Sequence, residues 1–336
     1  MTRSRPTPRR DEGPVRTLFF GSGAFAVPLL EVLRTLPEID LVGVVTTPDR
    51  PAGRNRRPAP TPVAARASDL GLPLLKPASL RTPDARVAIA ETRPELAVLA
   101  DYGRIVPAEI LALPARGFVN LHPSLLPRHR GATPIAGAIL AGDAETGVTL
   151  FQMDDGLDTG PVVAQVRWSL PDDATSETLE TEAAARAARL LATDLPAWLE
   201  GAREARPQDD ARATMTRPFS REDGRLDPDR PARELERRVR ALAPWPGTFV
   251  ETPDTRIVVL RVASGPSAAE DVPGLLVADD GGLGLATIEG RLRLLQVRPA
   301  GGRSMSGAEL RRGRPRLVGQ KVVGPDRGVA ASGIAR

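Results

Sequence analysis

The chain has 336 residues, of which 41% are hydrophobic, so it can bury one large core or two ordinary ones, and two domains are the expected organisation. It contains no cysteine, which excludes a disulfide framework, a thiolate nucleophile and a cysteine-ligated zinc or iron–sulfur site. The net charge is only +4, but nearly all cations are arginines, which bind phosphate through paired hydrogen bonds, so their positions must decide whether the chain binds nucleic acid.

The first 15 residues are basic, and the apolar segment of a signal peptide does not follow them. No apolar run approaches the roughly 18 residues that span a bilayer. We therefore expect residues 1–15 to be a disordered tail on a cytoplasmic protein. Residues 325–336 are small and polar, and we expect a second disordered tail there.

A strand, a tight turn and a helix are predicted over residues 16–36, where an apolar run and two glycines precede leucines at helical spacing. The alternation continues with strands at 40–47, 96–103 and 117–122 and helices at 62–71, 83–91 and 132–141. Strands separated by helices indicate an α/β fold with a mostly parallel sheet covered on both faces. Two extended runs at 147–170 and a helix at 175–201 complete a first domain, residues 16–203.

The character of the sequence changes after residue 203. Residues 204–216 are polar and lack apolar periodicity, which predicts an interdomain linker. An amphipathic helix then carries Leu235, Val239 and Leu242 on one face. Short strands with glycine turns follow it, and they indicate a small barrel or sandwich within residues 217–324.

Both histidines of the chain lie in the stretch NLHPSLLPRHRGATPI. Asn120 and His122 are two residues apart at the end of a predicted strand, so their side chains leave one face at the sheet edge where ligands bind. An amide beside an imidazole suits an oxyanion, whereas two histidines seven residues apart lack the spacing of a metal site. The alternative is that His122 only makes local hydrogen bonds. His129, flanked by arginines, is expected to be solvated.

The stretch MDDGLDTGP supplies three carboxylates, Asp154, Asp155 and Asp158, in a predicted tight loop. One of them can orient His122 and accept a proton from an amine. Spacing does not select among the three. Turn formation alone explains the same composition, because Asp and Gly dominate turns for conformational reasons.

Two further stretches suggest other functions. GSGAFA, residues 21–26, fits the glycine pattern of dinucleotide binders, but the acidic residue expected at the end of the next strand is missing, so a dehydrogenase is only weakly favoured. The loop at 48–62 carries Arg50, Arg54, Arg56 and Arg57 on a Pro- and Gly-rich segment and can reach a phosphate backbone. An ordinary solvated loop would have the same composition.

Eight stretches, in order between residues 16 and 320, resemble the methionyl-tRNA formyltransferase family. They are GSGAFAVPLL, TTPDRPAGRNRR, LKPASLR, ADYGRIVP, NLHPSLLPRHRGATPI, AGDAETGVTLFQMDDGLDTGPVV, ALAPWPGTF and VRPAGGRSMSGAEL. The Asn-x-His stretch is shared by folate-dependent formyltransferases in general. The arginine loop, PWPG and a second domain are typical of the methionyl-tRNA branch.

The resemblance implies a Rossmann-like formyltransferase domain, a C-terminal OB-like β-barrel domain that binds tRNA, and a monomer without a metal. It implies formyl transfer from 10-formyltetrahydrofolate to methionyl initiator tRNA, with Asn120, His122 and Asp158 as the catalytic residues. The donor would be held partly by the four residues Ser124, Leu125, Leu126 and Pro127. The acceptor arm would meet the four arginines Arg50, Arg54, Arg56 and Arg57.

Three positions depart from the family pattern. The first turn reads Gly21-Ser22-Gly23-Ala24-Phe25 in place of G-T-P-x-F, a usual basic pair is Gly302-Arg303, and a usual tryptophan is Pro228. Two other readings remain open beside the dehydrogenase. A formyltransferase for an amino-sugar nucleotide would share the catalytic residues and need no tRNA. An RNA-binding module without catalysis would use the arginine loop and the barrel alone.

Overall fold

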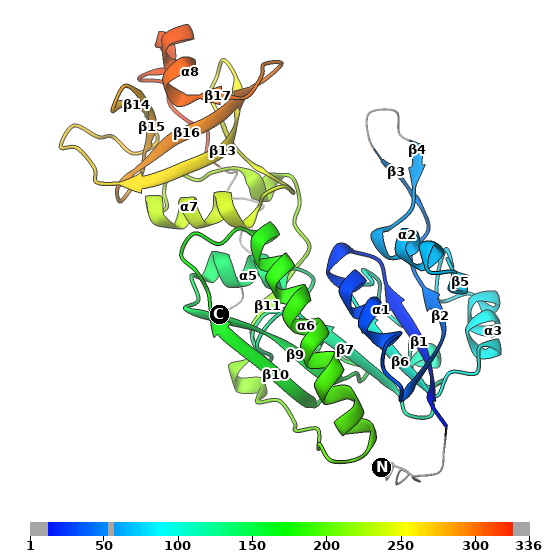
Figure 1. Cartoon of the computed structure of the whole chain (residues 1–336). Coiled ribbons are helices and arrows are strands. Elements are labelled where there is room, and N and C mark those ends of the chain that lie inside the picture. The colour runs from blue at the N-terminus through cyan, green and yellow to red at the C-terminus, as the bar shows by residue number, and fades with distance from the viewer. Residues whose placement is uncertain (1–12, 53–56, 325–336) are drawn as a thin grey trace. The chain divides into compact units, whose positions relative to one another are not determined.

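The computed structural model describes residues 13–52 and 57–324 (Figure 1). Its main chain divides into two compact units, and the chain passes between them more than once. The N-terminal unit comprises Met1–Pro134, Glu145–Trp168 and Glu180–Met215, and the C-terminal unit comprises Ile135–Ala144, Ser169–Leu179 and Thr216–Arg336. Two short segments that the sequence places in the first domain thus group with the second half of the chain.

The N-terminal unit is built on a seven-stranded sheet in the order β10-β9-β7-β6-β1-β2-β5. Its strands are β1 (Val15–Gly21), β2 (Ile39–Val45), β5 (Leu74–Leu75), β6 (Leu96–Ala100), β7 (Phe118–His122), β9 (Glu145–Gln152) and β10 (Val162–Ser169). β1 pairs in parallel with β2 and β6, and β6 pairs in parallel with β7. β9 runs antiparallel to β7. The expected mostly parallel α/β sheet is confirmed, and its first strand already begins at Val15.

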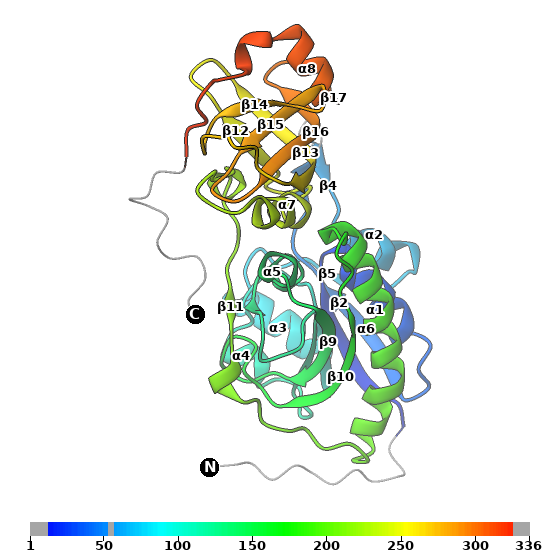
Figure 2. The same ribbon diagram turned by 90° about the vertical axis from the view of Figure 1, so that its left-hand side faces the viewer.

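Helices separate these strands as the sequence predicts. They are α1 (Val27–Leu33), α2 (Pro62–Asp69), α3 (Pro83–Glu91), α4 (Ala108–Leu111), α5 (Pro134–Ala141) and α6 (Ser176–Leu199). Thr61 and Thr82 begin α2 and α3 by accepting a main-chain N–H, each followed by a proline whose missing N–H costs nothing there. Because parallel crossovers are right-handed, α1 and α3 cover opposite faces of the sheet (Figures 1 and 2).

The centre of this sheet is buried on both sides. Every residue of β6 and β7 is buried, which explains why LAVLA and FVNLH read as continuous runs instead of alternating ones. Phe20 packs against Tyr102 and Phe118 at ring distances of 5.6 and 5.1 Å. This packing joins the carboxyl ends of β1 and β6 to the start of β7, and the candidate site lies at the carboxyl ends of these strands.

Two smaller pairs of strands complete the N-terminal half. β3 (Arg50–Ala52) and β4 (Arg57–Ala59) form a hairpin, and β8 (Arg130–Gly131) pairs with β11 (Met215–Thr216). A short 3₁₀ turn at Ala24–Ala26 precedes α1, and another lies at Asp210–Arg212. None of the helices in residues 13–52 and 57–324 is long and apolar enough to cross a bilayer.

The C-terminal unit holds an antiparallel sheet in the order β12-β13-β16-β15-β14, with β17 paired to β16. The strands are β12 (Thr248–Glu251), β13 (Arg256–Gly265), β14 (Leu276–Asp279), β15 (Gly282–Ala286), β16 (Arg291–Pro299) and β17 (Met305–Ser306). Residues 319–323 bond to both outer strands: Gly319 N donates to Leu276 O, and Val323 N donates to Glu251 O, each at 2.8 Å. The expected small β domain, closed like a barrel, is confirmed.

Two helices, α7 (Ala232–Ala241) and α8 (Gly307–Gly313), lie at opposite ends of this sheet (Figure 2). Short 3₁₀ turns lie at Glu222–Gly224 and Pro315–Leu317. Leu235 and Val239 of α7 and Leu310 of α8 enter one core with the inward side chains of the strands. Leu235 and Val239, two of the three residues of the predicted apolar face, therefore point into the core of this domain.

Candidate functional site

Asn120 and His122 lie on β7, between the parallel strand β6 and the antiparallel strand β9. Asn120 pairs with Leu99 and Phe151, and His122 pairs with Thr149. Both side chains are buried, with 7% and 5% of the residue surface exposed. Asn120 Oδ1 has no hydrogen-bond partner among the described residues. An unpaired acceptor in a buried site is unfavourable by about 1–3 kcal/mol, which indicates a position built to receive a donor.

The imidazole of His122 lies between two acceptors. Its Nε2 is 2.9 Å from the main-chain oxygen of His129, and its Nδ1 is 3.7 Å from Asp158 Oδ2. A carbonyl oxygen only accepts, so Nε2 carries a hydrogen whatever the charge of the ring. Nδ1 faces the carboxylate at a distance too long for a direct hydrogen bond.

The three aspartates of the loop between β9 and β10 make different contacts. Asp158 has a positive φ of 56°, and its Oδ2 accepts the main-chain N–H of Gly131 at 2.7 Å while facing His122. Asp154 Oδ1 accepts from Gly156 N and Thr159 Oγ1, which makes it a turn-forming residue. Asp155 is exposed. The structure brings Asp158, and neither of the other two, to the imidazole.

His129 is not solvated, contrary to our expectation. Only 6% of its surface is exposed, its φ is 58°, and its N–H donates to Thr214 Oγ1 at 2.8 Å. Its carbonyl is the group that holds His122 Nε2. The flanking arginines suggested solvent, but a segment far along the chain covers this loop.

That covering segment, residues 206–214, supplies a residue that sequence reasoning missed. Gln208 Nε2 donates to the main-chain oxygens of Asp158 and Gly160 at 2.8 and 2.7 Å. Gln208 Oε1 accepts from Arg130, which is buried and also bonds Asp210. Residues expected to form a plain linker therefore clamp the loop that carries Asp158. No local pattern marks a single glutamine in a polar run.

The residues proposed for the donor form a turn after β7. Ser124 Oγ donates to Arg128 O, and Leu126 is fixed through its main chain by Thr149 Oγ1 and Gln165 Nε2. Ser124 and Leu126 are buried, whereas Leu125 and Pro127 are partly exposed. The two partly exposed side chains are thus available to a ligand, and the two buried ones shape the turn.

The GSGAFA turn does not offer its amides to a phosphate. Ser22 N and Gly23 N both donate to the main-chain oxygen of Asp101, at 3.0 and 3.1 Å. A dinucleotide site of this type needs free N–H groups at that turn. The geometry therefore disfavours the dehydrogenase alternative.

Asp101, at the carboxyl end of β6, is a second residue that the sequence did not single out. The residue lies at the surface with a φ of 43°, but its carboxylate turns back onto the main chain: a Cβ at Gly23 would lie 1.6 Å from its Oδ2. Desolvation of the carboxylate, with a smaller contribution from the charge of Glu180, raises the pKa of Asp101 to about 7. It therefore titrates near neutral pH, beside the strand that carries His122.

The predicted arginine loop is partly within the described residues. Arg50 is exposed at the start of β3, and the main chain of Arg57 begins β4. Arg54 and Arg56 lie outside the described residues. In residues 13–52 and 57–324, no group of three or more His, Cys, Asp or Glu side chains is arranged to hold a metal ion.

Comparison with known proteins agrees with this architecture. A family model described as formyl transferase matches residues 15–195, and one described as formyl transferase, C-terminal domain, matches residues 218–315. The N-formyltransferase of Helicobacter canadensis, solved with folinic acid and dTDP-3-aminofucose, superposes with a TM-score of 0.62 at 16% identity, over 83% of this chain and 97% of that one. At that identity the likeness concerns the fold alone.

Sequence relatives are much closer. The methionyl-tRNA formyltransferase of Roseiflexus castenholzii is 46% identical over 312 residues, which are 92% of this chain and 99% of that protein. The methionyl-tRNA formyltransferase of Thermus thermophilus is 42% identical over 300 residues, which are 89% of this chain and 96% of that protein. With both domain matches in order, the chain belongs to the methionyl-tRNA formyltransferase family.

Proposed function

We propose that the chain transfers the formyl group of 10-formyltetrahydrofolate to the α-amine of methionyl initiator tRNA. Family membership supports both the reaction and the acceptor, because relatives of that name match nearly the whole chain. The single structural observation that carries the proposal is the grouping of an unpaired buried amide, an imidazole and a carboxylate at the end of β7. These groups suit direct attack by an amine, with no covalent enzyme intermediate.

The reaction balances as follows. The amine nitrogen attacks the formyl carbon, the bond from that carbon to N10 of the folate breaks, and one proton passes from the amine to N10. An α-amino group is partly neutral at pH 7, so it needs no strong base to become a nucleophile. The enzyme's task is to stabilise the charge on the formyl oxygen and to move the proton.

We assign Asn120 the role of hydrogen-bonding both the formyl oxygen and the attacking amine. Its Nδ2 would donate to the oxygen as negative charge develops there. Its Oδ1, which is buried without a partner among the described residues, would accept an N–H of the attacking amine. The Oδ1 atom is then satisfied only when the amine is bound, so binding energy is gained at the reacting centre.

His122 and Asp158 are assigned to charge and proton handling. The Nε2–H bond to His129 O fixes the ring, and Nδ1–H of the imidazolium is left for the formyl oxygen. Asp158, 3.7 Å from Nδ1, would stabilise the positive ring and take the amine proton, directly or through water. Gly131 N–H and the Gln208 clamp hold the carboxylate and its loop in position.

The donor would lie along the turn at 124–127. Leu125 and Pro127 provide the partly exposed apolar surface, while Ser124 and Leu126 keep the shape of the turn through their own hydrogen bonds. We assign the acceptor arm to the stretch of sequence that carries Arg50, Arg54, Arg56 and Arg57. We further propose that the enzyme is a monomer and works in the cytoplasm, where initiator tRNA is charged.

Formyl transfer from 10-formyltetrahydrofolate is the direct test, with methionyl initiator tRNA, free methionine and an amino-sugar nucleotide as parallel acceptors. Wild type is expected to formylate the charged tRNA alone, and His122→Ala is expected to lose that activity with an unchanged melting temperature. Transfer to the sugar nucleotide but not to the tRNA would favour the alternative formyltransferase. Transfer to no acceptor, with RNA still bound, would favour the non-catalytic module.

A further inference from the structure

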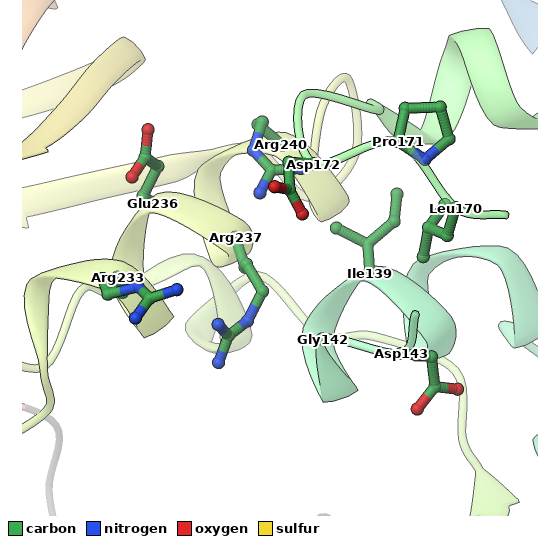
Figure 3. A pocket seen from close by; sticks show the side chains of 10 residues that line it. All are labelled: Ile139, Gly142, Asp143, Leu170, Pro171, Asp172, Arg233, Glu236, Arg237 and Arg240. Atoms are coloured by element: carbon green, nitrogen blue, oxygen red, sulfur yellow. The ribbon is translucent and has the colours of Figure 1, made fainter. Parts of the chain in front are cut away.

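The pocket beside α7 does not favour one class of ligand (Figure 3). It has a volume of about 290 Å³, and its wall carries both charges: Arg233, Arg237, Arg240, Asp143, Asp172 and Glu236. These opposite charges leave the wall without a net charge. All of its lining residues belong to the C-terminal unit, whereas Asn120, His122 and Asp158 belong to the N-terminal unit. A contribution to the proposed reaction is supported instead by hydrogen bonds within the N-terminal unit.

The turn of residues 124–127, to which we assign the folate donor, lies against strands β9 and β10. A Cβ atom on Gly147 of β9 would lie 2.2 Å from Leu125 Cδ2, so the missing side chain leaves room for Leu125. Two residues further along the same face of β9, Thr149 bonds to the main chain of the turn. Gln165 of β10 bonds to it as well. Three positions on these two strands thus fix the turn.

The hydroxyl of Thr149 uses its whole hydrogen-bonding capacity beside this turn. It donates to Ser124 O at 2.7 Å, and it accepts Leu126 N–H at 3.1 Å and Gln165 Nε2–H at 2.9 Å. One donated and two accepted bonds are all that a hydroxyl can make. A valine would suit this fully buried strand position equally well, because both side chains are branched at Cβ. The hydroxyl therefore serves the turn and not the strand.

The side-chain amide of Gln165 has one defined orientation. Its Nε2 lies 2.9 Å from both Leu126 O and Thr149 Oγ1. A main-chain oxygen only accepts, so the amide atom that faces Leu126 O is the nitrogen, and both of its hydrogens are used. Gln165 is exposed on β10, at the edge of the sheet. Replacing it therefore removes bonds to the turn without opening a cavity in the core.

Thr149 also connects the turn to the strand of the candidate site. It pairs with His122 across β7 and β9, and residues directly opposite each other place their side chains on the same face. Ser124 N donates to His122 O at 2.8 Å, so the turn is also bonded to the main chain of His122. The position of the turn relative to the imidazole is therefore set by hydrogen bonds. A shift of about 1 Å between reacting groups can lower a rate about a hundredfold.

We propose that Thr149 and Gln165 are positioning residues of formyl transfer, which keep the donor turn in a fixed position relative to His122. Neither side chain would touch the reacting atoms. Their hydrogen bonds fix Ser124 and Leu126, and the turn then determines where the bound folate presents its formyl group to Asn120. This inference deepens the proposed function and rests on it.

The test compares Thr149→Val, Thr149→Ser and Gln165→Met with wild type. Isothermal titration calorimetry measures binding of tetrahydrofolate, and steady-state kinetics measure formylation of methionyl-tRNA. Thr149→Val and Gln165→Met should each raise Kd for tetrahydrofolate and KM for the donor about tenfold and lower kcat about tenfold or more, because the turn can shift. KM for the tRNA should stay unchanged, whereas loss of folded protein would not change one KM selectively. Thr149→Ser keeps the hydroxyl and should behave as wild type.

Two controls match the site variants. Thr17→Val removes the hydroxyl of another fully buried threonine of the same sheet, one that donates to Val15 O within its own strand. Ser169→Ala changes another exposed residue of β10. Both controls should keep Kd, KM and kcat within about twofold of wild type.

Failure of this inference and failure of the proposed function give different results. Wild-type Kd, KM and kcat in both Thr149→Val and Gln165→Met, with formylation by wild type intact, would overturn the inference alone. Equal losses in Thr149→Val and Thr149→Ser would also overturn it, because the hydroxyl would not be their cause. A wild type that formylates no acceptor would show that the proposed function is wrong, and the tetrahydrofolate affinities would still decide whether the two residues fix the donor turn.

Discussion

At the residue scale, Asn120 and Asp158 are two candidate-site residues that each carry an unfavourable feature. A buried amide oxygen without a partner and a carboxylate held on a residue with positive φ both cost stability. Neither completes the core or a turn, unlike Asp154, which bonds two neighbours within its own loop. Their cost is consistent with a role in the reaction.

Asn120→Ala and Asp158→Asn are therefore expected to lower kcat by about 10²–10³, the usual effect of removing one group that stabilises a transition state. The matched control is Asp155→Asn, which changes an exposed carboxylate of the same loop and should leave kcat within about twofold. Steady-state formylation of methionyl-tRNA measures all three. Near-normal turnover of either site variant would remove that residue from the mechanism.

Asp101 should make folding stability depend on pH near neutrality. Its pKa is raised to about 7 in the folded protein, so between about pH 4 and pH 7 the folded state binds more protons than the unfolded state. Stability should therefore fall as the pH rises through this range and level off above it. The lowered pKa values of Asp223 and Asp271 act only at more acidic pH, where their stabilising ion pairs are lost as the pH falls.

To test this prediction, the free energy of unfolding of wild type and of Asp101→Asn is measured in urea at pH 5, 6, 7 and 8. The stability of the variant relative to wild type should grow from pH 5 to pH 7 and then stay constant. A difference that is the same at all four values would show that Asp101 does not titrate in this range.

At the element scale, the segment 206–214 connects the loops of the candidate site through hydrogen bonds. Gln208 joins the main chain of the Asp158 loop to Arg130, and Thr214 fixes His129, whose carbonyl orients His122. The sequence of this segment lacks apolar periodicity and therefore does not predict these hydrogen bonds. The segment is ordered by side-chain hydrogen bonds to distant loops and not by a pattern of its own.

Gln208→Ala should lower kcat by about tenfold to a hundredfold. The variant lacks the side-chain amide that donates to the main-chain oxygens of Asp158 and Gly160, so the loop that carries Asp158 can shift from the reactive geometry. KM for the donor should change less than kcat. Glu204→Ala, which changes an exposed residue just before this segment, is the control and should behave as wild type. A Gln208 variant with normal kcat and a lowered melting temperature would leave the brace only a structural role.

The hairpin β3–β4 belongs to the stretch of sequence that carries the four arginines assigned to RNA binding. Replacing Arg50, Arg54, Arg56 and Arg57 with alanine should raise KM for the tRNA and flatten its dependence on salt, since each lost phosphate contact removes a released counterion. Arg81→Ala with Arg86→Ala, exposed residues of the same unit, is the control. An identical salt dependence in the hairpin variant and wild type would exclude these arginines from RNA binding.

At the scale of the whole molecule, fold and acceptor are separable properties. The Helicobacter canadensis enzyme shares the architecture at 16% identity, yet its structure contains an amino-sugar nucleotide. The fold alone therefore does not decide the acceptor, which is why family membership and the RNA tests carry that part of the proposal.

Part of this molecule could be predicted from sequence because the signals are local. Apolar runs, glycine turns and helical spacing predicted the α/β sheet, the amphipathic α7 and the small β domain, and strand periodicity placed Asn120 and His122 on one face. Only the tertiary structure decided the antiparallel direction of β9, the burial of His129 and the contacts of Gln208 and Asp101. The physical reason is that each of these features depends on contacts between residues far apart in the chain. Such a contact produces no periodicity or spacing in the sequence around either residue.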